Sequence, residues 1–301
     1  MARLGIYRLY ALFVLFYSLV LLLMPANKDT LAAYQLSNSA YRTLLFVVVA
    51  LPAYLTWLAA FVGYDYLNRY TILLNGANEG KAFSKLTRGI KWLAYYLPVV
   101  SCTNLILMAI ANSHPGFRAF AEVSSGYLSI IIALGAFSLA SGGARQLTVL
   151  GKSRPTLLKT QLLTLSFIVM GVTYCYFIIK HGLDPHTSPY HLPIFWLLVT
   201  TVVPYFFAWM LGLLAVLDID AYATKVSGLL YRRALRLLSG GLFTVIVSSI
   251  LIQYVNSAAL QRSRIIFGLL LVLRYVLYAG LACGFLLIAH SAKKLQQIEK
   301  I

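Results

Sequence analysis

An arginine lies within the last apolar stretch of the chain. Residues 265–289 contain no Asp, Glu, Lys or Arg other than Arg274. A charged side chain near the bilayer centre costs about 2.5–3.5 kcal/mol on insertion scales, so we expect a group that compensates it. Glu122 is one candidate, as an ion pair. The alternatives are a ligand carboxylate or lipid phosphate held by the planar guanidinium, and a side chain that extends to the bilayer surface.

Two asparagines also interrupt apolar stretches. Asn104 and Asn256 are 152 residues apart, an offset that other pairs of residues share. An amide both donates and accepts hydrogen bonds, which suits a polar ligand. The sequence therefore predicts a ligand-binding site formed by Arg274, Glu122, Asn104 and Asn256.

Catalytic and metal-binding residue types lack their usual spacings. The chain has no GxxxxGK[ST], HExxH or GxSxG motif, so the corresponding phosphate, zinc and nucleophile sites are not expected. His181, His186 and His191 lie in one polar stretch with Asp184, but five-residue spacings match no standard metal site. We expect solvated loop histidines, with a metal or pH-sensing site as the alternative. No catalytic residue, metal or cofactor is predicted.

The carboxylates and thiols lead to the same expectation. Asp65, Asp218 and Asp220 adjoin the inner ends of two predicted helices, where capping or pairing with basic neighbours is expected and a paired-carboxylate active site is the alternative. The three cysteines lie in apolar runs without a CxxC motif, which favours unpaired thiols acting as small hydrophobic side chains; they are Cys102, Cys175 and Cys283.

Composition requires an apolar environment around these residues. Of 301 residues, 60% are hydrophobic and 11% charged, and the mean hydropathy is +0.81. A soluble domain carries about 25% charged residues. Spanning helices need about 20 mostly apolar residues, and eight stretches qualify: about 7–24, 43–63, 92–112, 120–141, 161–180, 193–217, 239–258 and 265–289. The fold expected is all-α, a polytopic transmembrane bundle of about eight helices forming one integral membrane domain, residues 1–301.

The basic residues indicate the topology. With a cytoplasmic N-terminus, 18 of the 25 Lys and Arg fall on the inside, six outside, and Arg274 within a helix. This asymmetry follows the positive-inside rule, and an anionic inner leaflet is the partner that it implies. It accounts for the net charge of +17 without nucleic acid. We therefore expect a multi-pass protein of the cell membrane with both termini in the cytoplasm.

The connections between the predicted helices are short. The longest expected loop, about residues 64–91, is cytoplasmic and includes the turn-rich sequence NGANEGK. At the C-terminus, Leu295, Ile298 and Ile301 recur at helical spacing, so the last helix is expected to continue into the cytoplasm, where a protein partner is one expectation.

An internal repeat is also expected. A gapless shift of 152 residues superposes scarce residue types: Pro52 on Pro204, Trp57 on Trp209, Tyr70 on Tyr222, Gly76 on Gly228, Gly89 on Gly241 and Asn104 on Asn256. The shift places the second and third helices on the sixth and seventh, so the halves, 1–150 and 151–301, would be parallel repeats of four helices each. Binding sites of such proteins lie at the repeat interface.

The leading functional prediction is a non-enzymatic protein that binds or transports a small or amphipathic molecule, in particular an anionic one, between the two halves. The alternative is a membrane sensor or assembly subunit that acts through a partner at the C-terminal helix. A continuous polar cavity would favour the first function, and a dry core with an exposed cytoplasmic helix the second. An intramembrane enzyme would require Asp65, Asp218 and His290 to meet in one pocket.

Overall fold

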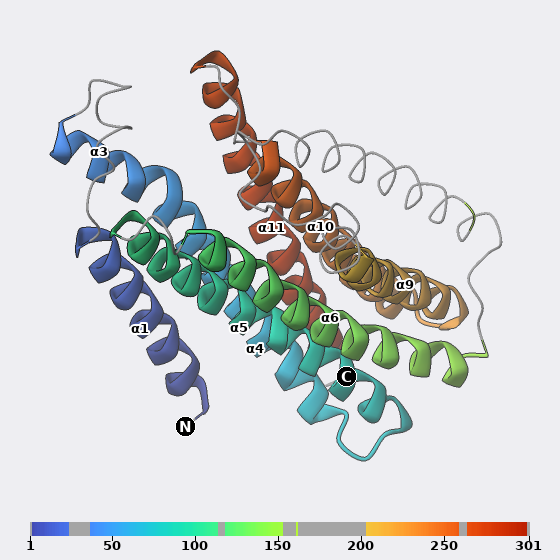
Figure 1. The fold of residues 1–301 in the computed structure, drawn as a ribbon. Coiled ribbons are helices and arrows are strands. Elements are labelled where there is room, and N and C mark those ends of the chain that lie inside the picture. The colour runs from blue at the N-terminus through green and yellow to red at the C-terminus, as the bar shows by residue number, and fades with distance from the viewer. Residues whose placement is uncertain are drawn as a thin grey trace.

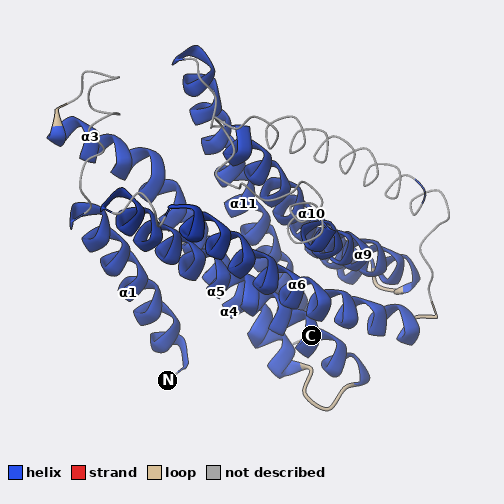
Figure 2. Ribbon diagram, viewed as in Figure 1, coloured by secondary structure: helices blue, strands red, loops and turns tan. Residues whose placement is uncertain are grey.

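The structure is a computed structural model that describes residues 2–23, 37–113, 118–152, 161, 203–258 and 264–299. Regular structure in these ranges is entirely helical (Figures 1 and 2). The elements are α1 (Ala2–Leu23), α3 (Asn38–Leu45), the π-helix η1 (Phe46–Ala50), α4 (Leu51–Leu73), α5 (Asn78–Ser113), α6 (Arg118–Leu150), α9 (Val203–Lys225), α10 (Leu229–Ala258) and α11 (Arg264–Ile298). Seven helical segments in the described residues are long and apolar enough to cross a membrane.

These helices confirm the expected all-α, multi-pass membrane fold. Seven of the eight predicted spans correspond to described helices. The fifth, residues 161–180, lies outside the described residues except for Gln161. An even number of helices is therefore still a prediction.

The helix ends differ from the sequence-based boundaries at one end of the bundle. The loop expected at about 64–91 is wrong, because α4 continues to Leu73 and α5 begins at Asn78. Gly76, in the turn between them, has a φ of +97°, a conformation that glycine adopts without steric cost. Continuous apolar runs mark only the part of a helix that faces lipid, so they do not show where the helix ends. The extra turns are amphipathic, and they bury residues such as Phe83 and Leu86.

Two pairs of helices that are distant in the sequence pack side by side and run parallel. Thr56, Gly63 and Tyr66 of α4 contact α11 at Tyr278, Phe285 and Gln296, in the same order along both helices. In the same way, Phe137 of α6 lies against Gly212 of α9, and Gly151 lies against Tyr222. Helices that are consecutive in the described chain, α4 with α5, α5 with α6, α9 with α10 and α10 with α11, also pack together.

Glycines allow the closest of these approaches. A methyl group at Gly89 would lie 2.6 Å from the carbonyl oxygen of Ala136, and one at Gly241 would lie 2.8 Å from that of Gly284. Small residues at helix contacts let backbones approach closely in membrane proteins. The α5–α6 and α10–α11 pairs therefore each pack closely at a glycine of the first helix.

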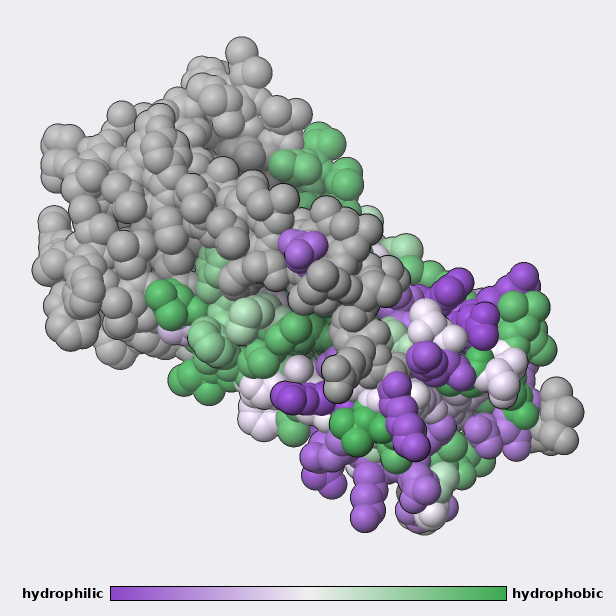
Figure 3. Space-filling view, turned by 90° about the vertical axis from the view of Figure 1, so that its right-hand side faces the viewer, coloured by the Kyte–Doolittle hydropathy of each residue, from purple (hydrophilic) through white to green (hydrophobic). Residues whose placement is uncertain are grey.

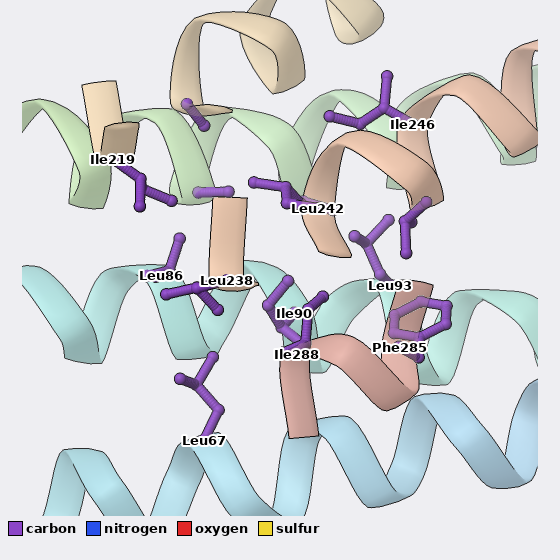
Figure 4. Packing of buried hydrophobic residues seen from close by; sticks show 14 of the residues in the cluster. Leu67, Leu86, Ile90, Leu93, Ile219, Leu238, Leu242, Ile246, Phe285 and Ile288 are labelled. Carbon is purple, nitrogen blue, oxygen red and sulfur yellow. The ribbon is translucent and has the colours of Figure 1, made fainter. Parts of the chain in front are cut away.

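A single apolar core joins α4, α5, α6, α9, α10 and α11. Its fully buried members include large aliphatic and aromatic side chains that converge from five of these helices (Figure 4): Leu67, Leu86, Ile90, Ile219, Leu238, Ile246, Phe285 and Ile288. Helix α1 adds a smaller cluster against α4, in which Tyr17 packs edge-on against Tyr54 and Trp57.

One end of the described bundle is hydrophilic (Figure 3). The α4–α5 turn, the end of α6, the α9–α10 turn and the end of α11 meet there, given the helix directions above. Helix α1 is antiparallel to α4, because Tyr10 contacts Phe61 and Tyr17 contacts Tyr54. The first and last described helices therefore have their terminal ends on this same side (Figure 1).

A π-helix precedes Pro52 and has a local cause. The N–H of Leu51 bonds to the carbonyl of Phe46 instead of that of Val47, and Pro52 has no N–H to offer. The carbonyl of Val47 is thus left without a donor in its own helix. The hydroxyl of Tyr275, from α11, donates to it.

Candidate functional site

Arg274 lies on α11 beside the contact of that helix with α4. The side chain is half-buried, and its guanidinium carbon lies 5.8 Å from the ring centroid of Tyr278, one turn along the helix. The Nε atom is buried and has no hydrogen-bond partner in the described part of the chain. The neighbouring Tyr275 hydroxyl is directed to Val47, so aromatic rings form the described surroundings of this cation.

The other predicted ligand residues are only partly placed. Asn104 is half-buried on α5 and already has an interaction partner. Glu122 lies on α6 and Asn256 on α10, but their side chains fall outside the described residues. The ion pair between Glu122 and Arg274 therefore stays a prediction.

The centre of the bundle holds a small cavity. Its volume is about 40 Å³, and its walls include Leu93, Phe137, Val245 and Phe285. Organic ligands occupy pockets of about 300–1,000 Å³, so this cavity has room for little more than water. Among the described residues, the centre is thus closely packed and largely apolar.

A much larger pocket lies along α5 where it faces α6. Its volume is about 450 Å³, which is within the range of small-molecule sites. Seven residues line it, and we call it the α5 groove: Arg88, Lys91, Trp92, Tyr95, Tyr96, Val99 and Ile132. Six of them lie on α5 at helical spacing, so one face of one helix supplies most of the site.

The polarity of the α5 groove changes along its length. Its two cations, Arg88 and Lys91, lie nearest the hydrophilic end of the bundle, the aromatic rings follow, and Val99 lies farthest along α5. At about 1.5 Å per residue, Arg88 and Val99 are about 16 Å apart along the axis. Gly135 of α6 faces the Trp92 ring, and a methyl group there would lie in van der Waals contact with it, at 3.4 Å.

Four side chains from four helices form a polar cluster at the hydrophilic end. The Glu79 carboxylate of α5 accepts hydrogen bonds from the hydroxyls of Tyr222 on α9 and Tyr231 on α10, the latter at 2.8 Å. The Tyr231 and Tyr70 hydroxyls are 3.0 Å apart, which brings in α4. We call these residues the Glu79 cluster.

The remaining titratable candidates, Asp65, Asp218 and His290, line neither of the two pockets. Asp65 is buried and forms an ion pair with Arg69, four residues along α4, as pairing with a basic neighbour predicted. His290 is exposed on α11. The described residues include no group of three or more His, Cys, Asp and Glu that could hold a metal ion. The outer histidines, His181, His186 and His191, lie outside the described residues.

The chain matches no protein-family model, no curated protein and no solved structure.

Sequence reasoning missed the α5 groove although a signal was present. In RGIKWLAYY, residues 88–96, the cations and aromatic rings recur three and four positions apart, which places them on one helical face. Arg88 and Lys91 were instead attributed to the loop expected at 64–91. The length of α5 decides the matter, because only a helix that continues through Arg88 aligns the cations with Tyr95 and Val99.

Proposed function

We propose that this protein binds an amphipathic anion that enters from the lipid bilayer, and that the α5 groove is the site. The order of groups along one helix face carries the proposal: cations, then aromatic rings, then aliphatic side chains. An amphiphile presents the same order, from charged head to apolar chain. Aromatic side chains of this kind favour the boundary between hydrocarbon and head groups.

The sequence predicts a ligand site between two repeated halves of the chain. We propose that this repeat is real. Helix contacts support it: α4 with α11 has a counterpart in α9 with α6, and α5 with α6 has one in α10 with α11. The offset is 152 residues for Gly89 and Gly241. It is 148 for Phe137 and Phe285, each of which lies against the opposite half.

The four-residue difference between these offsets is one helical turn. The same turn explains why Ala82 and Ala234, 152 residues apart, have partners that are 148 residues apart. The carbonyl of Ala82 lies against Gly143, and that of Ala234 accepts a hydrogen bond from the Ser291 hydroxyl. At an offset of 152 residues the counterpart of Arg274 would be Glu122, whereas at 148 it is Gly126. Because α6 and α9 are parallel neighbours, Leu150 at the end of α6 and Val203 at the start of α9 lie at opposite ends of the bundle, which supports an even number of crossings.

A carrier that passes its ligand through the centre is less well supported. The central cavity of about 40 Å³ lies between the proposed halves, and close packing there favours a binding function at the lipid-facing surface.

A sensor or assembly subunit is the second candidate, and the same closely packed centre favours it. The C-terminal helix argues against the expected mode of action. Leu295 is fully buried, and Gln296 donates a 2.6 Å hydrogen bond to the carbonyl of Tyr66. Helix α11 is thus held on the bundle up to its last turn, which leaves a smaller surface for a partner.

Fluorescence quenching tests the proposed function. The protein would be placed in phosphatidylcholine nanodiscs and titrated with brominated stearate or brominated phosphatidate, whose bromines quench nearby indoles. We expect saturable quenching that Trp92→Phe reduces. Arg88→Gln with Lys91→Gln removes two charge-assisted contacts and should weaken binding at least about tenfold.

The matched control is Lys293→Gln with Lys294→Gln, which removes the same charge from exposed positions on α11. This variant should bind as the wild type does. Quenching that does not saturate with either amphiphile, or that both double variants reduce equally, would contradict the proposal.

A further inference from the structure

Arg88 and Lys91 mark the end of the charged part of α5. Residues 92–113 contain no Asp, Glu, Lys or Arg. The two cations therefore lie where the hydrophilic end of the bundle gives way to its lipid-facing wall. The head groups of a surrounding leaflet lie at the same boundary.

No carboxylate of the described residues neutralises either cation, since the ion pair found there joins Asp65 to Arg69. Lys91 instead lies over aromatic rings, with its Nζ 6.0 Å from the centroid of Tyr64 and 5.7 Å from that of Tyr95. Aromatic faces attract an ammonium group without cancelling its charge. Two adjacent positive charges therefore remain for a ligand.

The second half of the chain shows what this helix face needs for packing alone. At an offset of 152 residues, the buried positions are kept: Ala82 and Ala234, Leu86 and Leu238, Gly89 and Gly241. The cationic and aromatic positions of the α5 groove are not kept, since their counterparts are Gly240, Phe243, Thr244, Val247 and Ser248. Helix packing thus does not require the cations or the aromatic rings of the α5 groove.

We propose that the α5 groove holds an anionic phospholipid from the leaflet at the cationic end, with its phosphate at Arg88 and Lys91 and an acyl chain along Val99 and Ile132. The inference rests on the proposed function and names its ligand. Arg88 and Lys91 are three residues apart on one helix face, so each can bind a different oxygen of a tetrahedral phosphate. A carboxylate has two oxygens in one plane and fits the pair less well.

Competition in the quenching assay tests the head group. Unlabelled phosphatidate, oleate or phosphatidylcholine would be added to nanodiscs that hold brominated phosphatidate. We expect phosphatidate to displace the probe at a mole fraction about tenfold lower than oleate, and phosphatidylcholine to displace little. Equal displacement by oleate would overturn the phosphate assignment while leaving amphipathic-anion binding intact.

Glycerol 3-phosphate in solution distinguishes a lipid from a free phosphate. We expect no displacement at millimolar concentration, because the apolar part of the groove would stay empty. Displacement comparable to that by phosphatidate would overturn the lipid assignment. If no anion gives saturable quenching, both this inference and the proposed function are overturned.

Arg88→Lys separates charge from geometry, since lysine keeps the charge but lacks the planar donor fork. The variant should bind phosphatidate several-fold more weakly and stearate about as well as the wild type. Its thermal unfolding should be unchanged, because Arg88 is exposed and has no ion-pair partner in the described residues. An equal loss for both amphiphiles would contradict phosphate recognition.

Discussion

At the scale of single residues, the Glu79 cluster links four helices through one carboxylate. Tyr70 and Tyr222 share the 152-residue offset, and so do Glu79 and Tyr231. The hydrogen bond of Tyr70 with Tyr231 thus corresponds to that of Tyr222 with Glu79. The cluster differs between the proposed halves at one position, where the first has a carboxylate and the second a phenol.

We predict that this carboxylate couples the two halves energetically. Tyr222→Phe removes a donor to Glu79 and should cost about 1.5–3 kcal/mol of unfolding free energy, the range for hydrogen bonds to charged groups. In a double-mutant cycle with Glu79→Gln, the two losses should be clearly less than additive. Unfolding in detergent micelles measures this, with Tyr7→Phe at an exposed position as the control. Strict additivity would show that the contact contributes little.

Arg274 has Tyr278 as an aromatic neighbour, and its ion pair with Glu122 stays a prediction. We predict that Tyr278→Leu and Arg274→Leu are coupled by about 0.5–2 kcal/mol, the range for a cation over an aromatic face. The same cycle with Glu122→Leu tests the ion pair predicted from the sequence, and coupling of several kcal/mol there would make Glu122 the main partner. Independent effects in both cycles would exclude both partners and leave a ligand contact or extension toward the bilayer surface as the explanation of Arg274.

Single residues of the candidate site could be predicted only in part. The cost of a buried charge makes Arg274 conspicuous in any sequence reading. Glu79 gives no such signal, because it follows the sequence NGAN and precedes Gly80 and Lys81, as solvated loop residues often do. Its role depends on Tyr222 and Tyr231, which are distant in sequence, and local patterns carry no information on that contact.

At the scale of helices, Pro52 determines a feature that reaches a second element. The proline frees the carbonyl of Val47, and Tyr275 of α11 satisfies it. Its repeat counterpart, Pro204, is the second residue of α9, in the described first turn. Proline is tolerated there because first-turn N–H groups have no partner within the helix.

We predict that Pro52→Ala makes the Tyr275 hydroxyl dispensable. Alanine restores an N–H, so residues 46–52 can return to regular helix and use their own carbonyls. Tyr275→Phe should cost about 1 kcal/mol in the wild type and little in the Pro52→Ala background. Thermal unfolding of the four proteins gives the coupling. An equal cost of Tyr275→Phe in both backgrounds would show that the π-helix does not depend on the proline.

Adjacent glycines on α6 offer a matched test of helix packing. A methyl group at Gly143 would lie 2.7 Å from the carbonyl oxygen of Ala82, whereas one at Gly142 would meet nothing within 4 Å. We predict that Gly143→Ala destabilises the protein by about 1–3 kcal/mol through overpacking. Gly142→Ala should stabilise it by up to about 1 kcal/mol through helix propensity. Similar effects of both substitutions on thermal unfolding would argue against close α5–α6 packing.

Helix type was predictable and helix length was not. Long apolar runs identify spanning helices because lipid leaves the backbone no other partner. Outside the hydrocarbon this constraint ends, and α5 extends 14 residues before the expected start at 92 because Ala82, Phe83, Leu86 and Ile90 bury one face. The apolar content of a segment does not detect such amphipathic extensions, whereas the helical spacing of their apolar residues would reveal them.

At the scale of the whole molecule, the charges and the helix directions are independent indications of topology. The sequence places basic clusters near residues 81–91, 145–159, 225–236 and 293–300. The structure brings the described helix ends of all four regions to the hydrophilic end of the bundle (Figure 3). Agreement between the two means that one membrane orientation satisfies the positive-inside rule for every cluster at once.

We predict that this end faces the cytoplasm, and thiol labelling in a protein whose native cysteines are replaced by alanine can decide it. Lys152→Cys lies just beyond α6 at the hydrophilic end, and Arg118→Cys lies at the start of the same helix. About 32 helical residues separate the two positions, so at about 1.5 Å each they are about 48 Å apart, which exceeds the hydrocarbon thickness. In intact cells a membrane-impermeant maleimide should label Arg118→Cys, and Lys152→Cys should react only after permeabilisation. The reverse pattern would invert the topology, and with it the leaflet that supplies a lipid to the α5 groove. Labelling of both positions in intact cells would mean that α6 does not cross the membrane, and the bundle of spanning helices would have to be rebuilt around it.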